Sequence, residues 1–162
     1  MALNNKEMAF DFVQRLLQEK LGGVFVRSSG GDFGRHCVFT WLRDTSVKFY
    51  VVYKREFFNS FGVWFPKFRG GVGESLNVEW LDFACRRGCL FVLFVYPDGR
   101  VFGVEPEFMR SYCVNNGLVR EQGSVNPVFG SQGDLLSVKE VTYCVPIGVL
   151  RDFCGVLEGW FS

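Results

Sequence analysis

The sequence predicts an α/β protein in which a central mixed β-sheet is flanked by helices. Residues 47–53 (VKFYVVY) are β-branched and aromatic, a composition that fits a pleated, half-buried surface. Residues 89–96 (CLFVLFVY) form a continuous apolar run of strand length, which is typical of a strand buried on both faces. Residues 4–20 and 75–87 carry apolar side chains at helical spacing. These segments together predict helices packed on a sheet whose centre is strand 47–53.

The signals at the ends of these segments support the same order of elements. Asn4 can cap the first helix, since Glu7 three residues later fits the capping-box pattern. Ser75 is the candidate cap of the second helix, and residues 97–99 (PDG) have the chemistry of a tight hairpin turn. The other expected elements are strands at 24–27, 37–42 and 100–104, a helix from 106 to about 116, an edge strand at 136–145 and a final helix at 147–157.

Length and composition favour one domain with an aromatic-rich core. The chain has 162 residues, 48% of them hydrophobic, and its 19 phenylalanines argue against intrinsic disorder. No apolar run approaches the roughly 20 residues of a membrane helix, and the N-terminus lacks the apolar core of a signal peptide. We therefore expect an intracellular, cytoplasmic protein with no membrane partner. It would consist of an α/β core at 1–104 and a helix-strand-helix extension at 105–162.

The cysteines and the charges narrow the kinds of site to expect. The six cysteines are scattered and form no C-x-x-C pair, so buried free thiols are the expectation. Residues 20–90 carry eleven Lys or Arg against six Asp or Glu, whereas the rest of the chain carries seven against eleven. A basic first half is compatible with a surface that faces phosphate groups.

Two stretches combine apolar residues with cations. The strand at 47–53 ends in Lys54, which either opens into a cleft, where α/β proteins place reactive groups, or is a solvated strand end. Residues 59–73 interleave aromatic side chains with Lys67 and Arg69. Such a loop either stacks bases beside phosphates or tucks its aromatic rings under the loop.

The order helix, strand, strand, strand, helix, strand resembles the core of the restriction-endonuclease-like (PD-(D/E)XK) superfamily. Within that superfamily, the sequence resembles the archaeal Holliday junction resolvase branch. Residues 11–17 (DFVQRLL) lead into 24–28 (VFVRS), as a glutamate-bearing helix leads into the first strand of that branch. In 49–54 (FYVVYK), Lys54 stands in the position of the family's catalytic lysine. The resemblance covers about residues 5–96 and implies action on DNA with Mg²⁺.

The acidic motif of that superfamily is degenerate here. Val52 stands where the resemblance would place a metal-binding glutamate, and the apolar Val38 and Phe39 stand near the position of its aspartate. Metal-assisted phosphodiester cleavage needs carboxylates to hold Mg²⁺ against the scissile phosphate. Of this machinery, only the cation is found at the expected position.

Carboxylates from other segments could replace the missing acids. Some members of the superfamily supply the glutamate from the following helix, and Glu74 or Glu79 resembles that arrangement. Asp11, Asp32 and Glu56 are the other acids within conceivable reach. Alternatively, Glu79 only favours a helix N-terminus and Glu56 only pairs with a neighbouring cation. The catalytic reading requires Lys54 to project into a hollow lined by these acids.

These observations predict a nucleic-acid-binding protein on a nuclease-like fold, with DNA as the first expectation. In the catalytic form, a Mg²⁺-dependent endonuclease, Lys54 and Glu74 are catalytic and Asp11, Glu74 and Glu79 hold the metal. One alternative is a DNA- or RNA-binding module with a decayed metal site. Another is a structural protein, a homodimer, in which the aromatic segment 57–68 docks on a partner. The candidate phosphate contacts are Arg27, Arg35, Arg55, Lys67 and Arg69.

Overall fold

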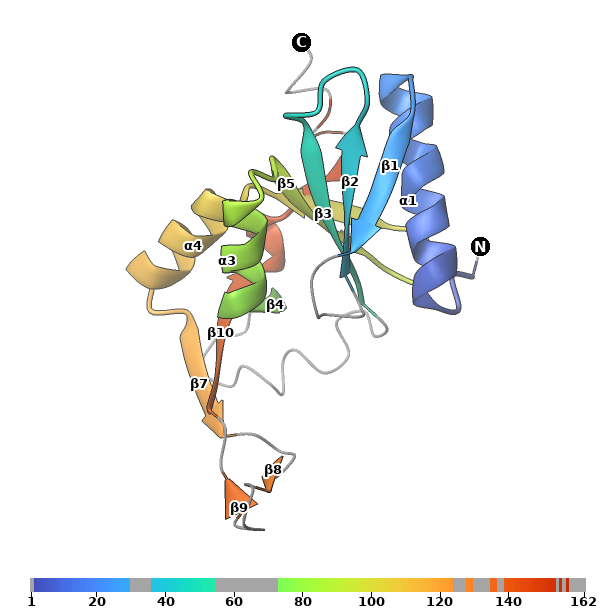
Figure 1. Cartoon of the computed structure of the whole chain (residues 1–162). Helices are drawn as coiled ribbons and strands as arrows, with labels where there is room; N and C mark the ends of the chain where they lie inside the picture. Colours follow the sequence, from blue (N-terminus) through green and yellow to red (C-terminus); the bar gives the residue numbers. More distant parts are fainter. Residues whose placement is uncertain are drawn as a thin grey trace.

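The structure, a computed structural model, describes residues 2–29, 36–54, 73–123, 128–129, 135–136, 139–153, 155 and 157. It is mixed α/β, as predicted (Figure 1). In chain order, the elements are α1 (Lys6–Leu21), β1 (Phe25–Ser29), β2 (His36–Trp41), β3 (Lys48–Tyr53), β4 (Gly73–Asn77), α3 (Val78–Arg86), β5 (Phe91–Val95), β6 (Val101–Val104), α4 (Pro106–Asn115), β7 (Val119–Gly123), β8 (Val128–Phe129), β9 (Leu135–Leu136), β10 (Lys139–Pro146), η1 (Ile147–Val149) and β11 (Arg151–Asp152).

The main sheet has six strands in the order β1-β2-β3-β5-β6-β11. Strands β1, β2 and β3 form an antiparallel meander, and β3 pairs with β5 in parallel. A parallel pair needs a crossover connection, and helix α3 lies within it. Strand β3 has a neighbour on each side, so the prediction that 47–53 is a central strand is confirmed.

The two faces of this sheet bury separate sets of side chains. In β3, Phe49 and Val51 pack in the core against α1, whereas Tyr50 and Val52 pack in the core that contains α3 and α4. Figure 1 shows α1 on one side of the sheet and these two helices on the other. All residues of β5 are buried, which confirms the prediction for the apolar run at 89–96. Alternation along the strands thus fixes which side chains each helix covers.

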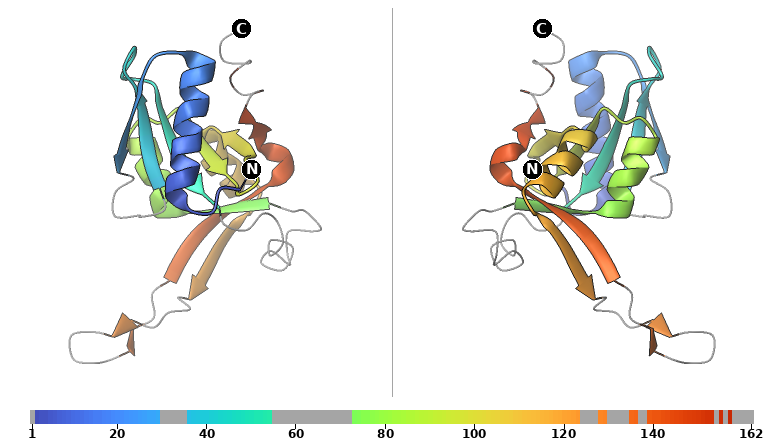
Figure 2. Two further views of the ribbon diagram at one scale, coloured as in Figure 1. Left: turned by 90° about the vertical axis from the view of Figure 1, so that its right-hand side faces the viewer. Right: turned by 90° about the vertical axis from the view of Figure 1, so that its left-hand side faces the viewer.

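A second sheet of three strands has the order β4-β10-β7. The prediction of an edge strand at 136–145 is wrong in one respect, because β10 is the central strand of this sheet. Its later half pairs with β4 and its earlier half with β7. The ribbon of β7 and β10 projects away from the main sheet (Figure 2). Segments 1–104 and 105–162 share both sheets, since β4 pairs with β10 and β11 pairs with β6.

Helix ends differ from the predictions at three places. The cap of α1 is Asn5, whose side chain accepts a hydrogen bond from the Met8 N–H, one residue after the expected Asn4. Helix α3 begins at Val78 after the cap Asn77, so the expected cap at 75 is wrong. The expected helix 147–157 is replaced at its start by η1 and β11, and only 153, 155 and 157 of its described later residues are helical.

None of the helices in the described part of the chain is long and apolar enough to cross a bilayer.

Helix α1 also protects the edge of the main sheet at β1. The amide of Gln14 donates to the Phe25 carbonyl at 2.7 Å, and the Phe25 N–H donates to Gln18 Oε1 at 3.1 Å. These two side chains satisfy backbone groups at the start of an edge strand, where unpaired N–H and C=O groups would otherwise be exposed. Gln14 and Gln18 on the polar face of α1 therefore form hydrogen bonds to the sheet.

Candidate functional site

Lys54 lies directly after β3, at the carboxyl end of the parallel pair formed by β3 and β5. Its backbone N–H donates to the Val95 carbonyl at 2.9 Å, which continues the strand pairing one residue beyond β3. Its Nζ lies 5.8 Å from the centroid of the Phe94 ring. In open α/β sheets, ligands bind outside the carboxyl ends of the strands, so this is a favoured position for a functional cation.

A pocket of about 260 Å³ opens at this end of the sheet. We call it the lysine pocket. It combines two ammonium groups, two side-chain amides and an aromatic wall. Of the described residues that line it, none is Asp or Glu. The lining residues are Asn4, Asn5, Lys6, His36, Val52, Tyr53, Lys54 and Trp80.

The start of α1 forms one wall of the lysine pocket and is held there by the segment before it. The Leu3 N–H donates to the Pro97 carbonyl at 2.9 Å, and the Tyr53 hydroxyl donates to the Leu3 carbonyl at 2.8 Å. These bonds tie the N-terminal segment to the hairpin turn and to β3. They place the positive end of the α1 dipole, together with Lys6, beside Lys54.

The opposite wall is a stack of rings. Trp80, in the first turn of α3, lies 4.1 Å from His36 between ring centroids, with the planes at 58°. Behind it, His36 stacks on Tyr50 at 5.3 Å and 11°. Tyr50 is fully buried, and burial raises the pKa of its hydroxyl. No hydrogen-bond partner for that hydroxyl is present among the described residues.

Two of the predicted metal-binding carboxylates, Asp11 and Glu79, are not among the described residues that line the lysine pocket. Asp11 lies on α1 and is exposed, with a carboxylate oxygen 4.0 Å from Arg27. Glu79 is exposed in the first turn of α3. Glu74 lies on β4 opposite Val145 in the strand register rather than at the start of a helix. Within the described residues, no group of three or more His, Cys, Asp or Glu is placed to hold a metal ion.

Among the predicted phosphate contacts, the structure describes Arg27, which already has partners. Its guanidinium donates to Glu7 at 2.7 Å, and this hydrogen bond raises the pKa of Arg27. It also lies over the Phe10 ring at 5.6 Å. The other predicted contacts, Arg35, Arg55, Lys67 and Arg69, fall outside the described residues, as do Asp32, Glu56 and the aromatic segment 57–68.

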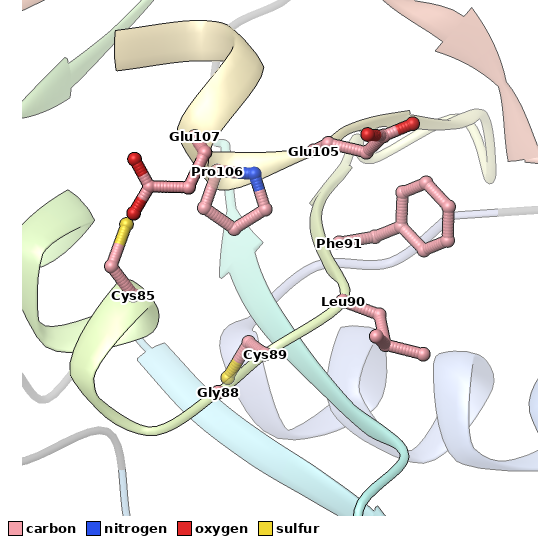
Figure 3. Close-up of a pocket in the computed structure, with 8 residues that line it drawn as sticks. All are labelled: Cys85, Gly88, Cys89, Leu90, Phe91, Glu105, Pro106 and Glu107. Atoms are coloured by element: carbon pink, nitrogen blue, oxygen red, sulfur yellow. The ribbon is translucent and has the colours of Figure 1, made fainter.

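A second pocket, of about 460 Å³, lies at the start of β5 (Figure 3). We call it the thiol pocket. Figure 3 shows the Glu107 carboxylate directed at the Cys85 thiol, whereas Glu105 points away from it. Burial and then the hydrogen bond to Glu107 raise the pKa of Cys85 to about 11. The pocket is lined by Cys85, Gly88, Cys89, Leu90, Phe91, Glu105, Pro106 and Glu107.

The thiols of the thiol pocket are poorly reactive, and its carboxylates are paired with arginines. Burial raises the pKa of Cys89 to about 11, so both thiols are protonated and poorly nucleophilic near neutral pH. Glu105 pairs with Arg151 at 3.0 Å, and Glu107 lies 3.4 Å from Arg110. Cys37, Cys85, Cys89 and Cys113 are free thiols, and all of them except the half-buried Cys85 are buried, as predicted.

Sequence reasoning identified Lys54 but missed its neighbours. In the sequence, Asn5 and Lys6 fall at the start of the predicted helix 4–20, Trp80 lies within the predicted helix 75–87, and His36 immediately precedes the predicted strand 37–42. The available signal was indirect: helices that follow strands in an α/β order begin at the same end of the sheet.

The chain was compared with protein-family models, with curated proteins and with solved structures, and it matches none of them.

Proposed function

We propose that this protein binds the phosphate backbone of nucleic acid at the lysine pocket, on a restriction-endonuclease-like core. The main sheet and its helices support the proposal, because without β4, which belongs to the second sheet, their order α1-β1-β2-β3-α3-β5 is the one that the resemblance implies. The antiparallel meander followed by a parallel β5 supports it as well. Lys54 then follows the third strand of that core, at the position of the family's lysine.

The observation that carries the proposal is the convergence of Lys6 and Lys54 in one pocket with the amides of Asn4 and Asn5. Ammonium groups are point charges that suit phosphate oxygens, and amide N–H groups add hydrogen bonds to them. The start of a helix adds backbone N–H groups and a positive partial charge on the same side. A phosphodiester therefore matches the charge and the donors of this site.

The same lining favours binding over cleavage. Metal-assisted cleavage uses carboxylate oxygens beside the scissile phosphate, whereas the described lining groups are mainly hydrogen-bond donors. We therefore place the binding module first. The second candidate is the Mg²⁺-dependent endonuclease, which is favoured by the position of Lys54 and would recruit Glu74 from the adjoining β4.

The test is a binding titration of labelled single-stranded, duplex and branched DNA, and of RNA, by fluorescence anisotropy at several salt concentrations. The wild-type protein is expected to bind at low salt, with affinity falling steeply as salt rises. Lys6→Ala and Lys54→Ala should each weaken binding several-fold and reduce the salt slope by about 0.7 to 0.9. Lys20→Ala is the matched control, because Lys20 is an exposed lysine in the last turn of α1.

Two results would overturn the proposal: failure of the wild-type protein to bind any of these nucleic acids at low salt, or equal weakening by Lys20→Ala. The same samples incubated with Mg²⁺ or Mn²⁺ separate the two candidates. Cleavage that is lost in both Lys54→Ala and Glu74→Ala would establish the endonuclease, and binding without cleavage would establish the binding module.

A further inference from the structure

We infer that the lysine pocket receives one unpaired nucleotide, with its phosphate at Lys6 and Lys54 and its base against the ring of Trp80. This inference rests on the proposed function and names the kind of nucleic acid that the site selects. It predicts a preference for single strands and for junctions or flaps with unpaired bases over continuous duplex.

The ring wall supplies the first step of the argument. Trp80 is half-buried, so part of its indole faces the pocket while the rest packs on the protein. His36 lies behind it at 4.1 Å and is 4% exposed, and Tyr50 lies behind His36. The Trp80 indole contacts the buried His36 ring, which itself stacks on Tyr50, and this packing restricts the orientation of the indole. It offers a preformed stacking surface with little entropy to lose on binding.

The position of the cations supplies the second step. Lys6 comes from the start of α1 and Lys54 from the end of β3, while Trp80 comes from the first turn of α3 on the other face of the sheet. The pocket therefore joins a charged side to an aromatic side across the end of one sheet. Proteins that bind single strands combine these two features, cations along the backbone and rings for the bases.

The size of the pocket supplies the third step. Its volume of about 260 Å³ is below the roughly 300 to 1,000 Å³ of pockets that enclose a drug-sized ligand. It can therefore hold one unit of a longer chain while the rest of the strand lies outside. In a continuous duplex each base is stacked and paired, and removing it costs energy, so an unpaired base enters most readily.

The test compares Trp80→Ala and Trp80→Phe with the wild-type protein on three ligands. These are a single-stranded oligonucleotide, the same strand with abasic sites throughout, and a continuous, fully paired duplex with blunt ends. Trp80→Ala should weaken binding to the single strand by about tenfold, the size of a base–aromatic stack, and Trp80→Phe should restore most of it. Binding to the abasic strand should be weaker than to the normal strand in the wild type, and unaffected by Trp80→Ala.

Failure of this inference can be distinguished from failure of the proposed function. If Lys54→Ala weakens binding but Trp80→Ala and the abasic strand behave as the wild type and the normal strand do, the pocket binds phosphate without a base. That result would overturn the inference and leave the proposed function intact. Circular dichroism and thermal unfolding of Trp80→Ala must match the wild type. If they do not, the normal-versus-abasic ratio of the wild-type protein alone decides, with a ratio near one overturning the inference.

Discussion

The two pockets lie at opposite ends of helix α3 and differ in their chemistry. The lysine pocket opens where β3 ends and where α1 and α3 begin. The thiol pocket opens where α3 ends, β5 begins and α4 begins. The first is lined by ammonium groups, amides and rings, and the second by thiols, carboxylates and apolar side chains.

This difference shows how the fold separates charge. The starts of α1 and α3 and two lysines lie at the lysine pocket, whereas the thiol pocket combines the start of α4 with two glutamates, which pair with Arg151 and Arg110. The larger pocket is therefore the poorer candidate for an anionic ligand, and size alone is a misleading guide to function in this protein.

Reversal of charge at the lysine pocket should have the largest effect. Lys6→Glu with Lys54→Glu should weaken nucleic-acid binding by about 30-fold or more, because two attractive phosphate contacts become repulsive. The comparison change at the thiol pocket, Glu105→Gln with Glu107→Gln, raises the net charge by two units, whereas the lysine pair lowers it by four, and it should change affinity by about twofold or less. Anisotropy titrations at fixed salt measure both. A large gain in affinity in the double glutamine variant would mean that binding depends on the total charge of the protein and not on the lysine pocket.

Alkaline pH should destabilise the protein through its buried thiols. Burial raises the pKa of Cys37 to about 12 and that of Cys89 to about 11. Because the unfolded chain loses these protons near pH 9 while the folded protein keeps them, stability is fully present below pH 9 and falls as pH rises. The expected slope is about 1.4 kcal/mol per pH unit for each thiol, until its folded pKa is reached.

The measurement is the urea midpoint between pH 8 and 10.5 under reducing conditions. Cys89→Ala should remove the contribution of Cys89, leaving that of Cys85 in the same pocket, and Cys37→Ala should remove the contribution of Cys37 in β2. If the slope above pH 9 were the same in the wild type and in both variants, other groups would be responsible for it.

Substitutions at the two helix caps distinguish an effect on stability from an effect on binding. Asn5→Ala and Asn77→Ala should each lower the free energy of unfolding by about 1 kcal/mol, since each side chain accepts a hydrogen bond from the first turn of its helix. Asn5 lines the lysine pocket and Asn77 does not. Chemical denaturation should therefore give similar losses, while titration should show weaker binding for Asn5→Ala only. Equal binding by the two variants would remove Asn5 from the site.

Two tyrosines of β3 should respond oppositely to loss of the hydroxyl. Tyr50→Phe removes a buried hydroxyl and should leave stability unchanged or raise it by up to about 1 kcal/mol. Tyr53→Phe breaks the hydrogen bond to the Leu3 carbonyl and should cost about 1 kcal/mol and weaken nucleic-acid binding. Thermal unfolding of the pair tests this. A loss in Tyr50→Phe larger than in Tyr53→Phe would contradict the assignment.

Strong local patterns predicted the main sheet and its flanking helices. The runs at 47–53 and 89–96 correspond to β3 and β5, and the turn at 97–99 is present with Gly99 at φ 89°. The start of α3 could not be predicted, because Leu76 lies at helical spacing from Trp80 but is buried from a strand. The partners of β10 depend on contacts with β4, far away in sequence, which periodicity does not reveal.

The candidate site was also predictable only in part, because local sequence patterns do not show which distant residues meet. Lys54 follows a conspicuous strand and was found. The other members of the lysine pocket come from three separate elements and meet only after folding. The acid-lined hollow was inferred from resemblance, and the described lining contains ammonium, amide and ring groups instead. Local sequence therefore predicted the position of Lys54, whereas the groups around it depend on tertiary structure.

The two glutamines of α1 that bond to the backbone of Phe25 limit how copies of this protein can associate. A strand from another molecule could extend the main sheet at the start of β1 only by displacing both amide side chains. Extension of the sheet at that position, into a fibre or a strand-swapped dimer, is therefore disfavoured, because these two hydrogen bonds must be broken first. A self-association surface, if one exists, is better sought on other parts of the molecule.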